Sequence, residues 1–191
     1  MPKLGMEPIR RDALVKATIA EIGAAQSLDV TVGQIARRAG MSSALAHHYF
    51  GGTDQIFLAA MRYILTEYSA EVRRELRLAK SPLKRAEAIV RASFDESCFD
   101  PATVSAWMTL YASSRTSTET YRLLVVYQGR LRSNLTHALR PISTDPAGDA
   151  ETIAALIDGL YLRAALSDGG SSTAASAQAL SVLHKLLGET E

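Results

Sequence analysis

Two short amphipathic segments separated by a single glycine constrain this chain more than any other feature. Residues 31–50 read TVGQIARRAGMSSALAHHYF. Thr31 and Gln34 form the T-x-x-Q capping-box pattern that marks a helix start, and Gly40 is the residue type favoured just after a helix end. A second helix begins at Ser42 or Ser43. A short turn with glycine between two such helices is typical of a helix-turn-helix.

The second helix of this motif enters the major groove of duplex DNA, where its N-terminal residues contact base edges. Here those residues are Ser42, Ser43, Ala44 and Leu45. Their small size permits close approach; the serines donate or accept hydrogen bonds, and Ala44 and Leu45 fit thymine methyl groups. We expect phosphate contacts from hydroxyl, aromatic and basic residues nearby, namely Lys3, Arg10, Arg11, Thr31, His47, His48, Tyr49 and Thr53. The three cations would form an N-terminal arm.

Other interpretations of this stretch remain open at the level of sequence. A glycine-punctuated helix pair also occurs in all-α proteins that do not bind DNA. A metal site at His47 and His48 is not expected, because neighbours on a helix point about 100° apart and no third ligand lies near. No cofactor is expected either.

The rest of the chain has a helical hydrophobic period throughout, and its only β-rich run, residues 29–32, is very short. Ile9, Ala13, Ala17, Ala20 and Ala24 would line one face of the first helix, with Leu14 and Ile22 beside it. Further helices are expected at about 53–79, 82–97, 101–114, 119–139, 150–167 and 173–187, with a loop at 140–149. The sequence predicts an all-α protein of about nine helices, with a three-helix DNA-binding domain at 1–52 and a ligand-binding and dimerisation domain at 53–191.

Composition and charge limit the classes of function. A net charge of +1 means that any nucleic-acid footprint is a local patch. Cys98 is the only cysteine, and the chain has neither a signal-peptide pattern nor a long apolar run, so we expect a cytoplasmic protein without a membrane span. No phosphate-binding glycine loop and no H-E-x-x-H motif is present, so an enzyme is not expected.

Residues 9–60 resemble the N-terminal domain of the TetR family of bacterial transcriptional repressors. The resemblance rests on T-x-x-x-I-A-x-x-A-G from Thr31 to Gly40, on S-x-x-x-x-x-x-Y-F from Ser42 to Phe50, and on the long helix that follows. The chain departs from the family at Thr53, where a phosphate-contacting lysine is usual. Segments such as FDE at 94–96 and AALIDGLYLRAALS at 154–167 are similar to the choline-responsive repressors of the glycine betaine pathway. The resemblance implies a dimer that represses genes converting choline to glycine betaine and is released by choline.

The last two helices are the expected homodimer interface. Their apolar stripes are Ile153, Leu156, Ile157, Leu160 and Ala164, then Ala177, Leu180, Leu183 and Leu187. The same stripes would also serve as the core of a single subunit. Together with the resemblance, they predict a four-helix bundle shared by two chains.

An aromatic and acidic set in the middle of the chain is the expected effector site. Quaternary ammonium ions are bound by aromatic faces and a carboxylate. The candidates are Phe94, Asp95, Glu96, Trp107, Tyr111, Tyr121 and Tyr127. Asp158 is interpreted as structural, and an aromatic pair at helical spacing also suits a plain core. The alternative function is a regulator of efflux or another pathway that responds to a different cationic or aromatic compound.

Overall fold

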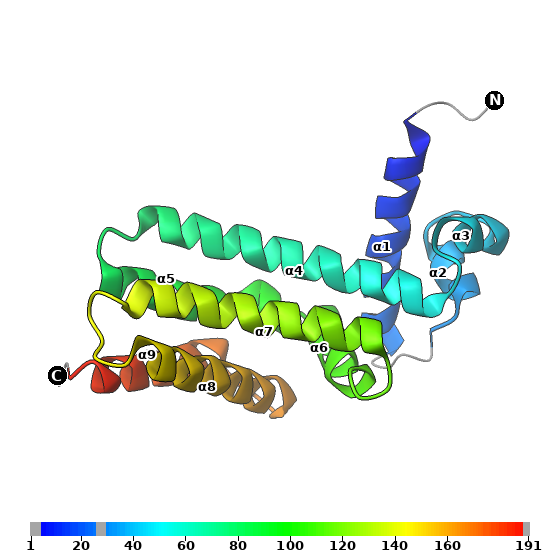
Figure 1. The fold of residues 1–191 in the computed structure, drawn as a ribbon. Coiled ribbons are helices and arrows are strands. Elements are labelled where there is room, and N and C mark those ends of the chain that lie inside the picture. The colour runs from blue at the N-terminus through cyan, green and yellow to red at the C-terminus, as the bar shows by residue number, and fades with distance from the viewer. Residues whose placement is uncertain (1–4, 26–29, 189–191) are drawn as a thin grey trace. The chain divides into compact units, whose positions relative to one another are not determined.

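The computed structural model describes residues 5–25 and 30–188, and Lys3 lies outside them. The described residues form nine α-helices and one short 3-10 helix, which confirms the predicted all-α class (Figure 1). In chain order they are α1 (Met6–Ala25), α2 (Val32–Arg38), α3 (Ser43–Phe50), α4 (Thr53–Leu78), α5 (Pro82–Ser93), η1 (Glu96–Phe99), α6 (Pro101–Ser113), α7 (Thr118–Leu139), α8 (Pro146–Leu166) and α9 (Ser172–Leu186). Across these residues, no helix is both long and apolar enough to cross a membrane.

Contacts between residues group the chain into two compact units. Unit 1 comprises residues up to Leu65 together with Asp100–Leu124, and unit 2 comprises Thr66–Phe99 with the chain from Val125 onward. Helices α4 and α7 contribute residues to both units. The expected domain boundary after residue 52 stays a prediction.

Unit 1 is built around α1. This helix packs on α6 and α2, and α2 packs on α3. The approach of α1 to α6 is close at Gly23, where an added Cβ would lie 2.5 Å from the Cβ of Ala102. The side chains that are fully buried here are aliphatic: Leu14, Ile22, Ile35, Ile56, Leu58, Met61 and Leu110.

Unit 2 packs α5 and α8 against α9. Its fully buried side chains include Ile89, Leu135, Leu139, Ile153 and Ile157. These residues recur at helical spacing, so each of these helices turns one apolar stripe inward.

A buried carboxylate links α5 to α9 in unit 2. The side chain of Glu87 is 2% exposed and accepts hydrogen bonds from Lys84 Nζ at 2.9 Å and Arg91 Nη2 at 2.7 Å. The Nε2 atom of His184 on α9 lies 3.0 Å from Glu87 Oε1. Burial alone would raise the pKa of Glu87, but the bonds from Lys84, Arg91 and His184 outweigh it and lower the pKa to about 2.

Two helix starts follow the capping residues that the sequence indicates. The Oγ atom of Ser81 accepts the Lys84 N–H at 3.3 Å, and Asp100 Oδ2 accepts the Ala102 N–H at 3.1 Å. A proline follows each cap at the first helical position, where its missing N–H costs nothing.

Two predicted boundaries are wrong. Helix α5 ends at Ser93 rather than near residue 97, because Asp95 Oδ1 accepts the Ser97 N–H and turns the chain into η1. Helix α8 begins at Pro146, inside the expected loop, because Asp145 caps it through the Gly148 N–H. Helix α4 begins at Thr53, which agrees with the expected start.

The predicted inner face of α1 is partly wrong: Ala17 is buried as expected, but two other members of the row are not. Ile9 is 62% exposed and Ala24 is exposed, whereas Leu14, Thr18 and Ile22 are buried. The alanine row suggested one face, but the larger Leu14 and Ile22 bury more apolar area and set the helix rotation.

Part of the expected dimer stripe belongs to the chain's own core. Ile153, Ile157 and Leu183 are at most 1% exposed within one chain, so the expectation that they contact a partner is wrong. Each is covered by the α8–α9 packing. Residues on the outer faces of these helices remain accessible: Leu156, Leu180 and Leu187 are half-buried, and Ala177 and Leu166 are exposed.

Candidate nucleic-acid interface and effector site

The capping pattern seen in the sequence fixes both ends of α2. The Gln34 N–H donates to Thr31 Oγ1 at 3.2 Å, and the Thr31 N–H donates to Gln34 Oε1 at 2.8 Å, so the capping box is confirmed. At the other end Gly40 has φ +66°, a conformation that favours glycine, and the Met41 N–H reaches the Ala36 carbonyl at 2.8 Å. The turn therefore forms as predicted.

Helix α3 starts on Ser42, whose Oγ accepts the Leu45 N–H at 3.3 Å, and it ends at Gly51 with φ +79°. It is eight residues long. A helix this short is marginal in water and depends on packing.

The faces of α3 divide clearly between core and solvent. Among the residues of α3, Ala46 is fully buried, at 0% exposure, and Leu45 and Tyr49 are half-buried. Ser42, Ser43, Ala44, His47 and His48 are exposed. The first turn of α3, with its small side chains, is therefore accessible and could enter a DNA groove.

The histidines of α3 are exposed but differ in their contacts. The Nδ1 atom of His47 lies 2.9 Å from the Gly51 carbonyl oxygen, which orients that ring at the end of the helix. The ring of His48 lies 5.6 Å from the ring of Tyr49. Thr53 is half-buried in the first turn of α4, where helix N–H groups favour anions.

The cations near α3 are only partly free. Arg11 pairs with Glu7 at 3.0 Å, and Arg38 pairs with Glu21. Within the described stretch of α1 to α3, Arg10 and Arg37 have no ion-pair partner. Arg37 lines a shallow cavity of about 350 Å³ with Glu21, Gln34 and Arg38. Arg37 is not among the phosphate contacts that the sequence predicted.

The expected effector residues in unit 1 form one stacked pair and one exposed ring. Trp107 and Tyr111 lie one turn apart on α6, and their ring centroids are 5.9 Å apart. Trp107 is buried, which fits either a ligand wall or a core residue. Tyr121 is 56% exposed.

In unit 2 the aromatic residues gather around a carboxylate that the sequence did not favour. Tyr127 is 9% exposed, and its hydroxyl donates to Asp158 Oδ1 at 3.1 Å. The ring of Tyr68 meets that of Tyr127 edge-on at 6.0 Å. The Tyr68 hydroxyl lies 2.9 Å from Ser93 Oγ, and burial raises the pKa of Tyr68, so it stays neutral. Phe94 is buried in the same unit.

The two acids expected at the effector site have other surroundings. Asp95 Oδ1 accepts both the N–H and the hydroxyl of Ser97, so it closes a local turn. Glu96 is exposed on η1. Asp158 is therefore better placed beside aromatic faces than either Asp95 or Glu96, although the sequence indicated only a structural role for it.

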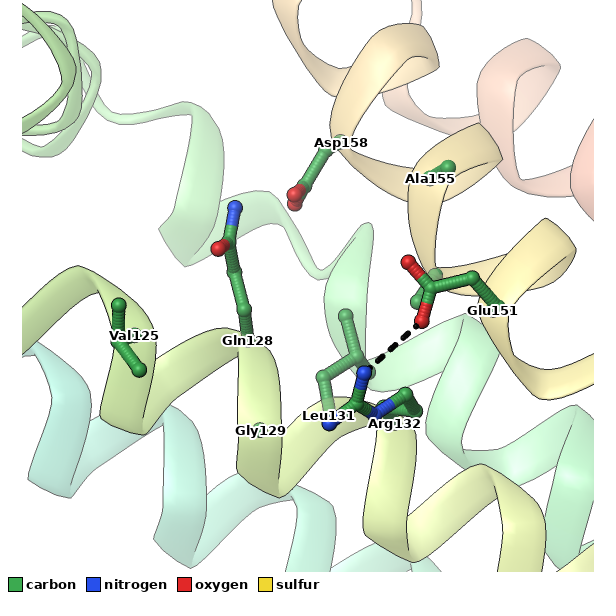
Figure 2. A pocket seen from close by; sticks show the side chains of 9 residues that line it. Val125, Gln128, Gly129, Leu131, Arg132, Glu151, Ala155 and Asp158 are labelled. Carbon is green, nitrogen blue, oxygen red and sulfur yellow. Dashed lines mark hydrogen bonds and ion pairs between the residues drawn. The ribbon is translucent and has the colours of Figure 1, made fainter. Parts of the chain in front are cut away.

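A cavity of about 300 Å³ lies between α7 and α8 in unit 2 (Figure 2). Figure 2 shows the side chains of Asp158 and Gln128 pointing toward each other across it, and an ion pair of 3.3 Å between Arg132 and Glu151. The remaining lining residues are small or apolar: Val125, Gly129, Leu131, Ala154 and Ala155. The carboxylate of Asp158 is thus reached by Tyr127 and also borders open space.

Two family models match the chain. Residues 14–60 match the bacterial regulatory proteins of the TetR family, and residues 82–188 match the C-terminal domain of the BetI-type transcriptional repressors. The two matches together cover the helix-turn-helix and most of the helices after it.

Relatives and solved structures agree with these matches. The HTH-type transcriptional regulator BetI of Brucella anthropi is 46% identical over 94% of this chain and 93% of its own length. The regulator of the same name from Agrobacterium fabrum is 48% identical over 87% of this chain and 82% of its own. A transcriptional regulator from Pseudomonas aeruginosa superposes with a TM-score of 0.83 at 22% identity, covering 97% of this chain and 93% of its own. A regulator from Saccharomonospora viridis in complex with choline superposes with a TM-score of 0.81 at 20% identity, covering 92% of this chain and 95% of its own.

Proposed function

Because this chain belongs to the TetR family of bacterial transcriptional regulators and has a BetI-type C-terminal domain, we propose that it binds operator DNA as a dimer and leaves it when choline binds. The genes under its control would be those that convert choline to glycine betaine. Membership of the family makes it a transcriptional repressor and not an enzyme.

The exposed first turn of α3 is the single observation that carries the DNA-binding part. Ser42, Ser43 and Ala44 are exposed, while Ala46 anchors the helix from its opposite side. Side chains this small let the helix backbone approach base edges closely. Arg10 and Arg37 then supply charge for phosphate contacts, which fix the register of the protein on the duplex.

Dimerisation through α8 and α9 supports the same function. A pair of helix-turn-helix elements reads two half-sites separated by about 34–36 Å or a multiple of one DNA turn. The accessible outer residues of the two helices, such as Leu156, Leu180 and Leu166, are apolar and available for a partner. A solution mass of one chain would contradict this part of the proposal.

For the effector we propose a site built on Asp158, Tyr127 and Tyr68. A quaternary ammonium ion has no N–H to donate, so a protein binds it through aromatic faces and a negative charge. The Tyr127 hydroxyl bonds to Asp158, the Tyr127 ring meets that of Tyr68, and the cavity that Asp158 lines leaves room for a small ligand. Phe94, which is buried in the same unit, is a candidate for a further wall. The choline bound to the Saccharomonospora viridis regulator supports this choice of effector.

Calorimetric titration of choline tests the effector assignment. Asp158→Asn keeps an oxygen that accepts the Tyr127 hydroxyl but removes the charge, so choline affinity should fall at least about tenfold. Asp95→Asn is the matched control, because it makes the same change at a carboxylate engaged in a local turn. Equal loss in both variants, or no loss in Asp158→Asn, would reject the assignment.

Release from DNA requires that choline bind the free protein more tightly than the protein–operator complex, because a ligand shifts an equilibrium only through its differential affinity. Equal choline affinities in the two states would rule out the release mechanism. The second candidate is a regulator of efflux or another pathway, which the aromatic faces would also suit. Tighter binding of a hydrophobic cation such as tetraphenylphosphonium than of choline or betaine aldehyde would favour it.

A further inference from the structure

Arg11 of α1 makes an unusual set of contacts with the end of α3. Its guanidinium carbon lies 5.6 Å from the ring centroid of Tyr49 and 5.1 Å from that of Phe50. Its Nε atom donates to Glu7 Oε1 at 3.0 Å. Both rings are half-buried, and all four residues belong to unit 1.

These contacts matter because α3 has few others. The helix is eight residues long, and Ala46 is its only fully buried residue. A guanidinium within about 6 Å of an aromatic centroid is attracted by the ring face. Arg11 touches two successive rings in the last turn of α3, so it ties that turn to α1 at the end opposite the Ser42 cap.

The ion pair with Glu7 bears on the alternative role, a phosphate contact. A phosphate-binding arginine gains affinity by replacing condensed counterions with its own charge. The charge of Arg11 is already opposed by Glu7, and its guanidinium lies over two rings. Arg10, the preceding residue, has no such carboxylate partner among the described residues.

We propose that Arg11 is a positioning residue, which orients the recognition helix α3 by holding Tyr49 and Phe50 and does not contact a DNA phosphate. This rests on the proposed function, in which α3 reads the operator. The planar guanidinium is essential to the role, because lysine is a point charge that does not stack on a ring in the same way.

Operator binding separates the two roles of Arg11. The probe is a DNA duplex spanning the region upstream of the protein's own gene, titrated over a range of salt concentrations. Arg11→Gln and Arg11→Lys should each weaken binding about 5- to 30-fold, with the slope of log affinity against log salt unchanged. A phosphate contact predicts instead that the slope falls by about 0.9 per subunit in Arg11→Gln and that Arg11→Lys retains affinity. Either of these results would overturn the proposal.

A double-mutant cycle with Phe50→Leu tests the ring contact itself. Leucine keeps an apolar side chain at this half-buried position but removes the ring face. The losses of affinity in Arg11→Gln and Phe50→Leu should then be non-additive, because each variant breaks the same contact. Additive losses would contradict the proposal.

Hydrogen exchange in the free protein gives a readout that needs no DNA. Amides of residues 43–50 should exchange at least about 5-fold faster in both Arg11 variants, while those of α9 are unchanged and Arg10→Gln behaves like the wild type. If the wild type fails to bind the duplex, the proposed function is at fault, and the exchange data still decide the role of Arg11. Unchanged exchange in α3 would refute that role.

Discussion

Replacing Glu87 by glutamine should destabilise the fold strongly at neutral pH. One pKa unit corresponds to about 1.4 kcal/mol, so lowering the pKa of Glu87 from 4.5 to about 2 is equivalent to about 3 kcal/mol of stabilisation. Lys84 and Arg91 are about half exposed, so solvent screens part of their interaction with Glu87. We therefore expect Glu87→Gln to lower the free energy of unfolding by about 2–3 kcal/mol. For a chain of this length that lowers Tm by about 5–10 °C.

The pH dependence of the effect follows from the sign of the shift. The folded-state pKa is below the unfolded value, so the ionised carboxylate stabilises the fold fully above about pH 4.5 and loses this effect as the pH falls toward 2. At pH 3 less than half of the difference between wild type and Glu87→Gln should remain. The assay is urea denaturation at one fixed protein concentration, because the dimerisation that we propose would make apparent stability depend on concentration.

Glu151→Gln is the matched control for this prediction. It makes the same change at an ion pair in unit 2 whose partners, Glu151 and Arg132, are 64% and 59% exposed. An exposed pair contributes about 0–1 kcal/mol, so this variant should be close to the wild type. The reasoning fails if Glu87→Gln is no less stable than Glu151→Gln at pH 7, or if its deficit does not shrink in acid.

Three further predictions concern single positions. Burial, with a smaller contribution from Asp95, raises the pKa of Cys98 to about 12. Iodoacetamide should therefore alkylate this thiol at pH 8 only after urea unfolds the protein. Rapid alkylation of the native protein would contradict this prediction. Gly23→Ala should lower the free energy of unfolding in urea by about 1–3 kcal/mol, because the added Cβ would meet Ala102. Gly129→Ala, with open space around the added Cβ, should leave the free energy of unfolding unchanged or raise it. Equal effects of the two changes would be evidence against the close α1–α6 contact. Thr31→Ala should lower the free energy of unfolding by about 1 kcal/mol, because it removes the capping box, and Thr31→Ser should lower it much less. Similar losses in the two variants would show that the hydroxyl is not the stabilising group.

Local signals in the sequence predicted the helix starts well, because capping residues act within one turn. Ser81-Pro82 and Asp100-Pro101 both begin helices where expected. The same signal at Asp145-Pro146 lies within RPISTDPAGD, whose proline, glycine and aspartate content predicts a loop. Asp145 caps α8 in the same way as the other two, so the information was present in the sequence.

Rotation of helices and long-range pairing could not be predicted in this way. The choice of Leu14 over Ile9 as an inward residue of α1 depends on what α6 presents to that helix. Tyr127 and Asp158 are 31 residues apart, and nothing in either local pattern pairs them. The sequence therefore favoured Asp95 and Glu96, which directly follow Phe94 in one short run, and not Asp158, on which we propose that the effector site is built.

The charges around α3 determine how this protein must hold its operator. Of the arginines and lysines within the described stretch of α1 to α3, Arg11, Lys16 and Arg38 are paired with Glu7, Asp12 and Glu21, which leaves Arg10 and Arg37 for phosphates. Thr53 supplies a hydroxyl where the family usually has a lysine. Since two arginines of this described stretch are unpaired, we expect base contacts at the exposed turn of α3 to supply a large share of the affinity for the proposed operator. Such contacts depend on the orientation of the helix, and that is why a residue that fixes this orientation, as we propose for Arg11, affects affinity without adding charge.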